Sequence, residues 1–341
     1  MKKLMLTTAL AGLLVGGNAI AQTTITGELR LALHASAAKG DTTASKRSIG
    51  NEQQINIQTK GKLNVGGLDY AAGFSLENDG SQSTTLYNEN VYMDFTNASS
   101  GTTISISRDH IQRADTDRSN GVFFGYSPLD TTDGSTAATS LFTSTGTGVG
   151  QAYGIGIIQN VGSFGKLSYF YAPSAGDTAT TSEGNAETDV ESGYEIGFTG
   201  DLGVKGLDVY AFRNQVKRAP ADAKKGEFEN YGIKYTTGDI TAGYTKKIFT
   251  AASTSSAANE VTENHYGLAY AVDKNLTIGV FKATASKDGA AAKEKVDYIQ
   301  VGYNLGPVAL TAGYAENRNI SGVTAATADS DSVFVRLVGA F

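Results

Sequence analysis

The chain has 341 residues with 41 Gly, 17 Tyr and 14 Phe against 4 Pro, no Cys and no Trp, and its formal net charge is −6. The lack of Cys excludes a disulfide framework, a thiolate nucleophile and a Cys-ligated metal. An acidic chain without a basic stripe also argues against a nucleic-acid partner.

The N-terminus has the pattern of a secretory signal peptide. Lys2 and Lys3 precede a short apolar run, and Ala19-Ile20-Ala21 then stands before Gln22. A transmembrane anchor is the alternative, but the apolar run is shorter than the ~20 residues that a spanning helix needs. The sequence therefore predicts a signal peptide over 1–21, cleavage between Ala21 and Gln22, and one domain over 22–341.

From residue 22 onward, apolar side chains recur at every second position, which indicates β-strands. In 24–33, Ile25, Leu29 and Leu31 share one face while Glu28 and Arg30 share the other. The same alternation predicts sixteen strands, on the apolar residues of 25–33, 55–63, 68–76, 91–95, 104–106, 153–157, 167–171, 194–198, 207–209, 231–235, 240–244, 266–272, 276–280, 299–303, 308–314 and 333–341.

The connections between these strands alternate in length. Short connections rich in Gly, Asn and Asp suit tight hairpins. They lie at 65–67, 97–101, 161–165, 201–206, 236–239, 273–275 and 304–307. Longer polar stretches separate them, and the longest runs from about 108 to 150. This rhythm predicts that all the short turns lie at one end of the sheet, together with both termini.

The number of strands decides which way the apolar face points. A closed barrel of about sixteen strands keeps an aqueous channel, so its apolar side chains cannot fill the interior and must face lipid. Aromatic residues beside both sets of connections are expected to form two girdles at the membrane interfaces. They are Tyr70, Phe95, Tyr235, Tyr270, Tyr303 and Phe341 near the short turns, and Tyr87, Tyr171, Tyr194, Tyr244, Tyr266 and Tyr314 near the long loops. Inward glycines, such as Gly73, Gly197, Gly232 and Gly313, are expected to keep the wall clear for water.

With these features the chain resembles the general porins of Gram-negative outer membranes. The resemblance rests on the exported N-terminus followed by "TITGELRL", the sixteen-strand loop rhythm, the very long third loop and the final Phe341. It implies a 16-stranded antiparallel transmembrane β-barrel in the outer membrane, with the third loop folded into the lumen. It also implies a homotrimer in contact with outer-membrane lipid and lipopolysaccharide, and it makes Phe341 a signal for the barrel assembly machinery.

The third long loop is rich in charge, and we expect it to form the constriction of the pore. Its charged residues are Arg108, Asp109, Arg113, Asp115, Asp117, Arg118, Asp130 and Asp133. They would face a basic wall across the lumen, and the transverse field would select passing solutes. The candidates for that wall are the basic residues at positions that point inward: Arg30, Lys60, Lys62, Lys234 and Arg336. A solvated external loop is the alternative, and Arg108 shares the outward parity of Ile104 and Ile106.

No metal-binding or catalytic motif stands out, and we expect no resident cofactor. The stretch 115–121 resembles a calcium loop, but its Gly falls one place late and Tyr126 occupies the position of the bidentate Glu, so only calcium on the loop acids stays open. His34, His110 and His265 are scattered. The chain is therefore not expected to be an enzyme.

The sequence thus predicts an outer-membrane channel for passive diffusion of ions and small hydrophilic solutes. A substrate-specific channel for a sugar or an organic anion is the alternative, and it would need an aromatic slide or an arginine ladder in the lumen. Inward aromatics do occur at Tyr92, Phe170, Tyr210, Phe212 and Tyr298. An outer-membrane hydrolase would need a Ser and a His together on the lipid-facing wall. A barrel with a plugged lumen is the fourth interpretation.

Overall fold

The protein is described here by a computed structural model, which covers residues 22–38, 46–63, 66–79, 87–111, 149, 152–173, 192–216, 225–250, 260–324 and 329–341. Within these ranges it contains sixteen β-strands and one short 3-10 helix, η4 (Ile320–Gly322). The strands are β1 (Gln22–Ala38), β2 (Lys46–Lys62), β3 (Asp69–Asp79), β4 (Tyr87–Asn97), β5 (Thr102–Arg108), β6 (Gly154–Asn160), β7 (Lys166–Ala172), β8 (Gly193–Gly200), β9 (Leu207–Val216), β10 (Gly226–Thr237), β11 (Ile240–Thr250), β12 (Glu260–Ala271), β13 (Leu276–Lys287), β14 (Glu294–Asn304), β15 (Val308–Arg318) and β16 (Ser330–Ala340).

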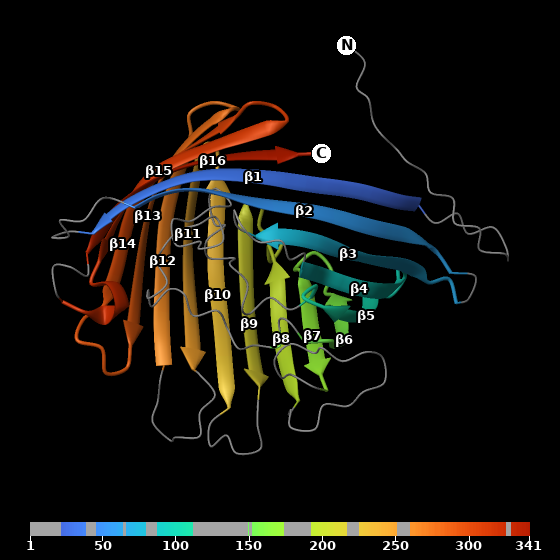
Figure 1. The fold of residues 1–341 in the computed structure, drawn as a ribbon. Coiled ribbons are helices and arrows are strands. Elements are labelled where there is room, and N and C mark those ends of the chain that lie inside the picture. Colours follow the sequence, from blue (N-terminus) through green and yellow to red (C-terminus); the bar gives the residue numbers. More distant parts are fainter. Residues whose placement is uncertain are drawn as a thin grey trace, which may run out of the picture.

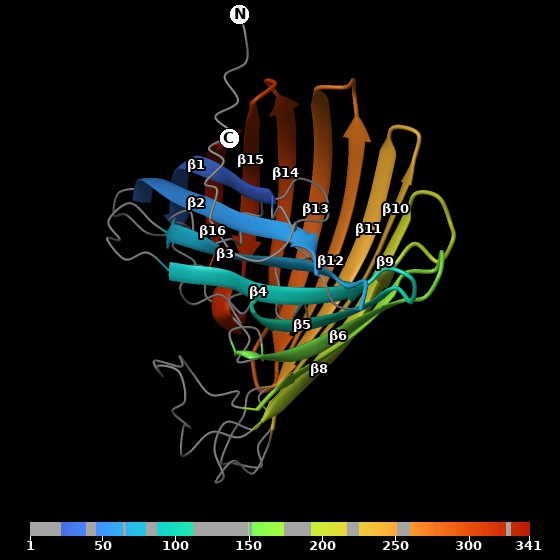
Figure 2. The ribbon, with the colours of Figure 1, turned by 90° about the vertical axis from the view of Figure 1, so that its right-hand side faces the viewer.

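The strands form one closed antiparallel barrel, as the loop rhythm predicted (Figure 1 and Figure 2). Each strand pairs with its neighbours in sequence, and β1 pairs with β16 to close the ring. The last residue extends this seam, because the Gly27 amide donates to the Phe341 carbonyl at 2.9 Å and the Phe341 amide donates to the Gly27 carbonyl at 3.0 Å. Phe341 therefore belongs to the sheet rather than to a frayed tail.

The strands differ in length. β1 and β2 have 17 residues each, whereas β5, β6 and β7 have 7. The alternation predicted that the second strand begins at about Gln54, but β2 begins at Lys46. Its backbone pairs with β1 over this whole length, and the last register pair is Ser36 with Lys46. Pairing depends on main-chain groups, so it continues through 46–53, where the side-chain alternation is weak.

The short turns share a side-chain device that explains their residue types. In four of them the Oδ1 atom of an Asn or Asp accepts a backbone amide two residues on, which fixes an Asx turn. The pairs are Asn97 with Ser99 at 3.0 Å, Asp201 with Gly203 at 2.9 Å, Asp273 with Asn275 at 2.7 Å, and Asn304 with Gly306 at 2.8 Å.

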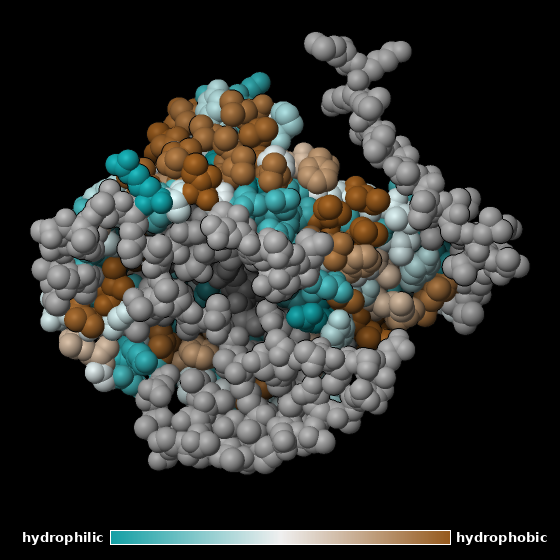
Figure 3. Space-filling view, in the orientation of Figure 1, coloured by the Kyte–Doolittle hydropathy of each residue, from teal (hydrophilic) through white to brown (hydrophobic). Residues whose placement is uncertain are grey.

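The outer face of the barrel is apolar. Along β12 the exposed fraction is 50% for Leu268, 5% for Ala269 and 51% for Tyr270, so large apolar side chains point outward and the intervening ones are covered. Figure 3 shows hydrophobic surface of this kind over the region where β15 and β16 lie in Figure 1. No helix in the described ranges is long and apolar enough to cross a membrane. The exposed tyrosines include Tyr235, Tyr270 and Tyr303 beside short turns and Tyr171, Tyr194, Tyr266 and Tyr314 toward the long loops, in agreement with the two predicted girdles.

Several inward glycines serve a purpose other than the one expected. A Cβ on Gly197 would collide with the ring of Phe212, its register partner on the next strand. The same relation joins Gly232 to Tyr210 and Gly313 to Phe334. These glycines provide space for aromatic rings that lie flat against the inner wall, and Phe212 and Phe334 are thereby almost fully buried.

This packing predicts that Gly197→Ala destabilises the barrel by about 1–3 kcal/mol, because the added methyl must displace the Phe212 ring. Heat-dependent loss of the compact band on denaturing gels measures the effect. Gly339→Ala is the matched control, since a Cβ at Gly339 meets nothing within 4 Å. Equal unfolding temperatures for the two variants would contradict the explanation.

Candidate functional site

Two of the predicted basic residues lie side by side on the inner wall at the closing seam. Arg30 is on β1, and Arg336 is on β16 opposite Ala32 of β1. Both lie near mid-height: Arg30 is eight residues from the start of the 17-residue β1, and Arg336 is six residues from the start of β16. Arg336 is 3% exposed, so its guanidinium is packed within the barrel rather than extended into bulk water.

Arg30 is held by two carboxylates. Its Nε contacts Glu28 on the same strand, and its NH1 contacts Glu52, the register partner of Arg30 on β2. The Glu28 contact was expected from parity, whereas the Glu52 contact could be found only from the register between β1 and β2. The side chain of Glu52 is 5% exposed, and pairing with a guanidinium offsets much of the cost of burying that charge. The seam therefore presents a charge network rather than an isolated cation.

The other three predicted basic residues lie toward the short-turn end of the barrel. Lys62 is the last residue of β2 and contacts Asp69 Oδ1 at 3.0 Å. Lys234 contacts Asp208 Oδ2 at 3.4 Å near the turn between β10 and β11. Lys60 pairs in register with Gln22 at the beginning of β1. The structure thus separates a mid-height pair, Arg30 and Arg336, from three lysines at the rim.

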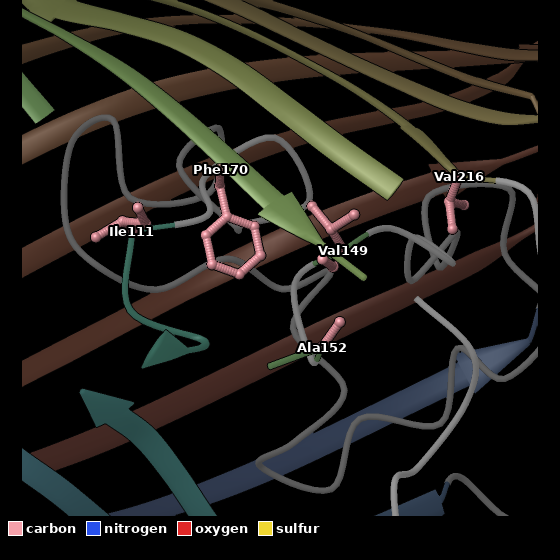
Figure 4. Close-up of a cluster of buried hydrophobic side chains, with 6 residues drawn as sticks. Ile111, Val149, Ala152, Phe170 and Val216 are labelled. Carbon is pink, nitrogen blue, oxygen red and sulfur yellow. The ribbon is translucent and has the colours of Figure 1, made fainter. Parts of the chain in front are cut away.

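The two described ends of the third loop turn onto the inner wall (Figure 4). Ile111, just after β5, and Val149 pack with Phe170 of β7 and Val216 of β9 in one buried cluster. A Cβ on the inward Gly156 would collide with Ile111, which places that side chain against the inside of the barrel. His110 is fixed nearby, with its Nε2 3.1 Å from Asp94 Oδ2 and its ring 3.9 Å from that of Tyr92.

Most of the predicted constriction residues lie outside the described ranges: Arg113, Asp115, Asp117, Arg118, Asp130 and Asp133. Asp109 directly follows β5 and has a positive φ of 52°. Arg108 is still part of β5, opposite Val91, and its guanidinium lies 5.8 Å from the centre of the exposed Tyr153 ring. The strand keeps its alternation to its last residue, so Arg108 belongs to the outer face and does not join the lumen charges.

Sequence reasoning missed several inward acidic residues. Glu195 of β8 is 2% exposed, and β8 lies on the opposite side of the closed ring from β16. Glu263 of β12 is also buried and contacts His265 Nε2 at 2.9 Å. Glu294 at the start of β14 is 1% exposed. Each of these residues alternates with outward apolar residues of its own strand. The period of two along each strand would therefore have predicted that they point inward.

The alternative functions make demands that the described residues do not meet. Of the predicted inward aromatics, Phe170, Phe212, Tyr210 and Tyr298 are all buried, so they do not form an exposed slide for a sugar. A lipid-facing hydrolase needs an outward His, but His34 and His265 point inward and His110 bonds to the inward Asp94. Among the described residues, no group of three or more His, Cys, Asp or Glu side chains could hold a metal ion.

A family model described as Gram-negative porin matches residues 7–321. The chain belongs to the Gram-negative porin family. No curated protein matches it. Solved porin structures share its fold, with an anion-selective porin from Comamonas acidovorans at 14% identity, a TM-score of 0.69, and coverage of 94% of this chain and 100% of that one. OmpF of Salmonella typhi, solved with daunomycin, aligns at 13% identity and TM-score 0.68 over 94% and 98% of the two chains. The DcaP channel of Acinetobacter baumannii aligns at 13% identity and TM-score 0.66 over 94% and 97%.

This porin is therefore an outer-membrane channel that lets ions and small hydrophilic solutes diffuse through a water-filled barrel. The family and the fold are those of channels and not of enzymes.

The charge network at the seam predicts an effect on ion selectivity. Arg30→Gln leaves Glu28 and Glu52 without their cation and should raise the cation-to-anion permeability ratio about twofold or more. Reversal potentials in a potassium chloride gradient measure the ratio. Lys62→Gln is the control, because that lysine is 85% exposed at the rim and should change the ratio little. An unchanged ratio in Arg30→Gln would show that ions do not pass near the seam.

Proposed function

We infer that this porin is a general diffusion channel whose narrowest level lies between the Arg30–Arg336 pair and the acidic residues of the third loop. The main support for this inference is the position of the two arginines, which are adjacent on the inner wall near mid-height. Ile111 and Val149 support the loop's part in this arrangement, because both ends pack against the inner wall. Between the low-dielectric walls of the barrel, opposed charges create a field across the passage that orients and sorts solutes.

The porin would work as a homotrimer that associates through the outer face of β16, β1 and β2. Leu, Ile and Val are the commonest outward residues of these strands, and Phe341 is the one aromatic among those described. Aromatic residues mark membrane interfaces, so a gap in the girdles indicates a face that lipid does not cover. Asn51 and Gln53 also lie on this face, opposite Leu31 and Leu29. Amides are costly in hydrocarbon but can hydrogen-bond within a subunit interface.

The rest of the outer face would contact membrane lipid, with lipopolysaccharide at the long-loop end. Toward the long loops, the outer surface also carries a band of ion pairs. Arg213 contacts Glu227 and Glu229, each at 3.3 Å, and Lys282 contacts Asp297 at 3.3 Å. Such a band suits phosphate-bearing and sugar-bearing headgroups. Phe341 would be read by the barrel assembly machinery, and calcium on the acids of the third loop stays a prediction.

Planar bilayer recordings test this function. The purified porin should produce ohmic current steps that arrive in groups of three, because each trimer inserts three pores together. Double replacement Asn51→Leu with Gln53→Leu should lower the temperature at which trimers dissociate on gels by several degrees, since interface hydrogen bonds are lost.

The same double variant separates the interface from a lipid-facing surface. If lipid covered this face, replacing amides by leucine would leave the assembly unchanged or more stable. Ala242→Leu on the outer face of β11 is the control and should not affect dissociation. Single current steps together with an unaffected double variant would contradict the trimer, and the absence of any conductance would contradict the channel.

A further inference from the structure

The pairing of β3 with β4 contains a local irregularity on the inner wall. The register is Gly73 with Tyr92 and then Ser75 with Glu89, which is a β-bulge. Beside it, Asn90 has a left-handed φ of 49°. Among the strand pairings of the described residues, this is the one whose register shifts. Bulges change the direction of nearby side chains and are common next to functional sites. The residues around this bulge are therefore candidates for a binding site.

A cavity of about 280 Å³ opens at the bulge. Because liquid water occupies roughly 30 Å³ per molecule, the cavity has room for one small solute. Asn56 and Gln58 of β2 and Tyr92 of β4 are inward residues of the barrel wall, and Phe74, which has outward parity, borders the cavity. The remaining lining residues are Ser75, Asn90 and His110.

The polar groups of the cavity are already positioned. Ser75 Oγ donates to Asn56 Oδ1 at 2.6 Å, and Asn90 Nδ2 lies 3.5 Å from Ser75 Oγ. Since the Asn56 oxygen accepts from Ser75, its amide nitrogen is the group that can donate to a solute. Gln58 is exposed on the same wall, and its amide supplies both a donor and an acceptor.

The aromatic side of the cavity is rigid. Tyr92 lies against Gly73, where an added Cβ would be 2.9 Å from its Cε1 atom. Its other contact is the His110 ring, stacked at 3.9 Å with an interplanar angle of 7°. Asp94, 3.1 Å from His110 Nε2, holds that ring in place. The described residues that line the cavity carry no carboxylate, ammonium or guanidinium group, so the lining offers amide, hydroxyl and imidazole groups as donors and acceptors.

We propose that this cavity is a transient binding subsite for neutral, hydroxyl-rich solutes, at the level where the third loop leaves the wall. Hydroxyl groups both donate and accept, which matches amide and hydroxyl side chains at fixed positions. The described lining holds no carboxylate, ammonium or guanidinium group that would pair with an ion. The subsite rests on the channel function and adds to it. It raises the occupancy of such solutes near the constriction without making the pore specific for one of them.

Conductance in planar bilayers tests the subsite, with glucose as the probe. Bound solute obstructs ion flow, so glucose should lower the conductance saturably, beyond its effect on the bulk electrolyte, with half-saturation on the order of 10 mM. Fully O-methylated glucose has a similar shape but no hydroxyl donors. It should change the conductance only in proportion to bulk conductivity.

The double variant Asn56→Leu with Ser75→Ala removes the paired polar groups and should weaken the apparent affinity about tenfold. Thr96→Val is the matched control, because Thr96 is an inward polar residue of β4 outside the cavity and should leave the affinity unchanged. Should the double variant fail to fold, Gln58→Leu alters an exposed side chain and should still weaken binding.

The outcomes separate this subsite from the channel itself. Equal saturable block in wild type, the double variant and Gln58→Leu would place the binding elsewhere and overturn the proposal. A wild-type pore that conducts ions but responds to glucose only through bulk conductivity would also overturn it, while leaving the channel function intact. A chain that forms no conducting pore would contradict the channel function instead.

Discussion

Closure of the sheet between β1 and β16 is the constraint on which the rest of the structure depends. In hydrocarbon each unpaired backbone amide or carbonyl costs several kcal/mol, so a sheet that spans a membrane must return to its first strand. The final residue takes part in this closure, since Phe341 exchanges two backbone hydrogen bonds with Gly27. The terminal aromatic thus has a structural role in the sheet in addition to any role in assembly.

Closure also sets the positions of the functional groups. It brings Arg30 and Arg336, which lie far apart in the sequence, onto adjacent strands of the inner wall. The outward positions of the strands are occupied largely by Leu, Ile, Val and Tyr. The side chains that contact solutes in the lumen therefore come from the inward positions between them. The inner wall is accordingly mixed: buried aromatics such as Phe212 and Phe334 lie over glycines, and ionisable residues such as Glu52 and Arg336 lie between them. Selectivity therefore depends on which inward positions reach the open passage.

Much of this arrangement follows from the sequence because it is periodic. Strand number, turn positions and the outward face depend only on alternation and on Gly, Asn and Asp at turns, as Asn97 and Asp273 illustrate. Register does not follow from alternation. The register between neighbouring strands determines three features that the sequence did not predict. They are the Arg30–Glu52 contact, the extension of β2 to Lys46 and the bulge at Gly73. Parity did place Arg108 correctly with the outward residues, but loop composition had suggested a role in the lumen. The glycine–aromatic pairs could have been found from opposing Gly and Phe positions once the register was known.

Spin-label accessibility on β10 tests most directly whether hydrocarbon covers the apolar face and water fills the interior. Since the chain has no Cys, nitroxides can be attached singly at Ile233, Lys234, Tyr235 and Thr236 in reconstituted membranes. The barrel predicts alternation, with high oxygen accessibility at Ile233 and Tyr235 and high accessibility to a water-soluble nickel complex at Lys234 and Thr236. A uniform profile, or nickel access at the apolar positions, would contradict the account.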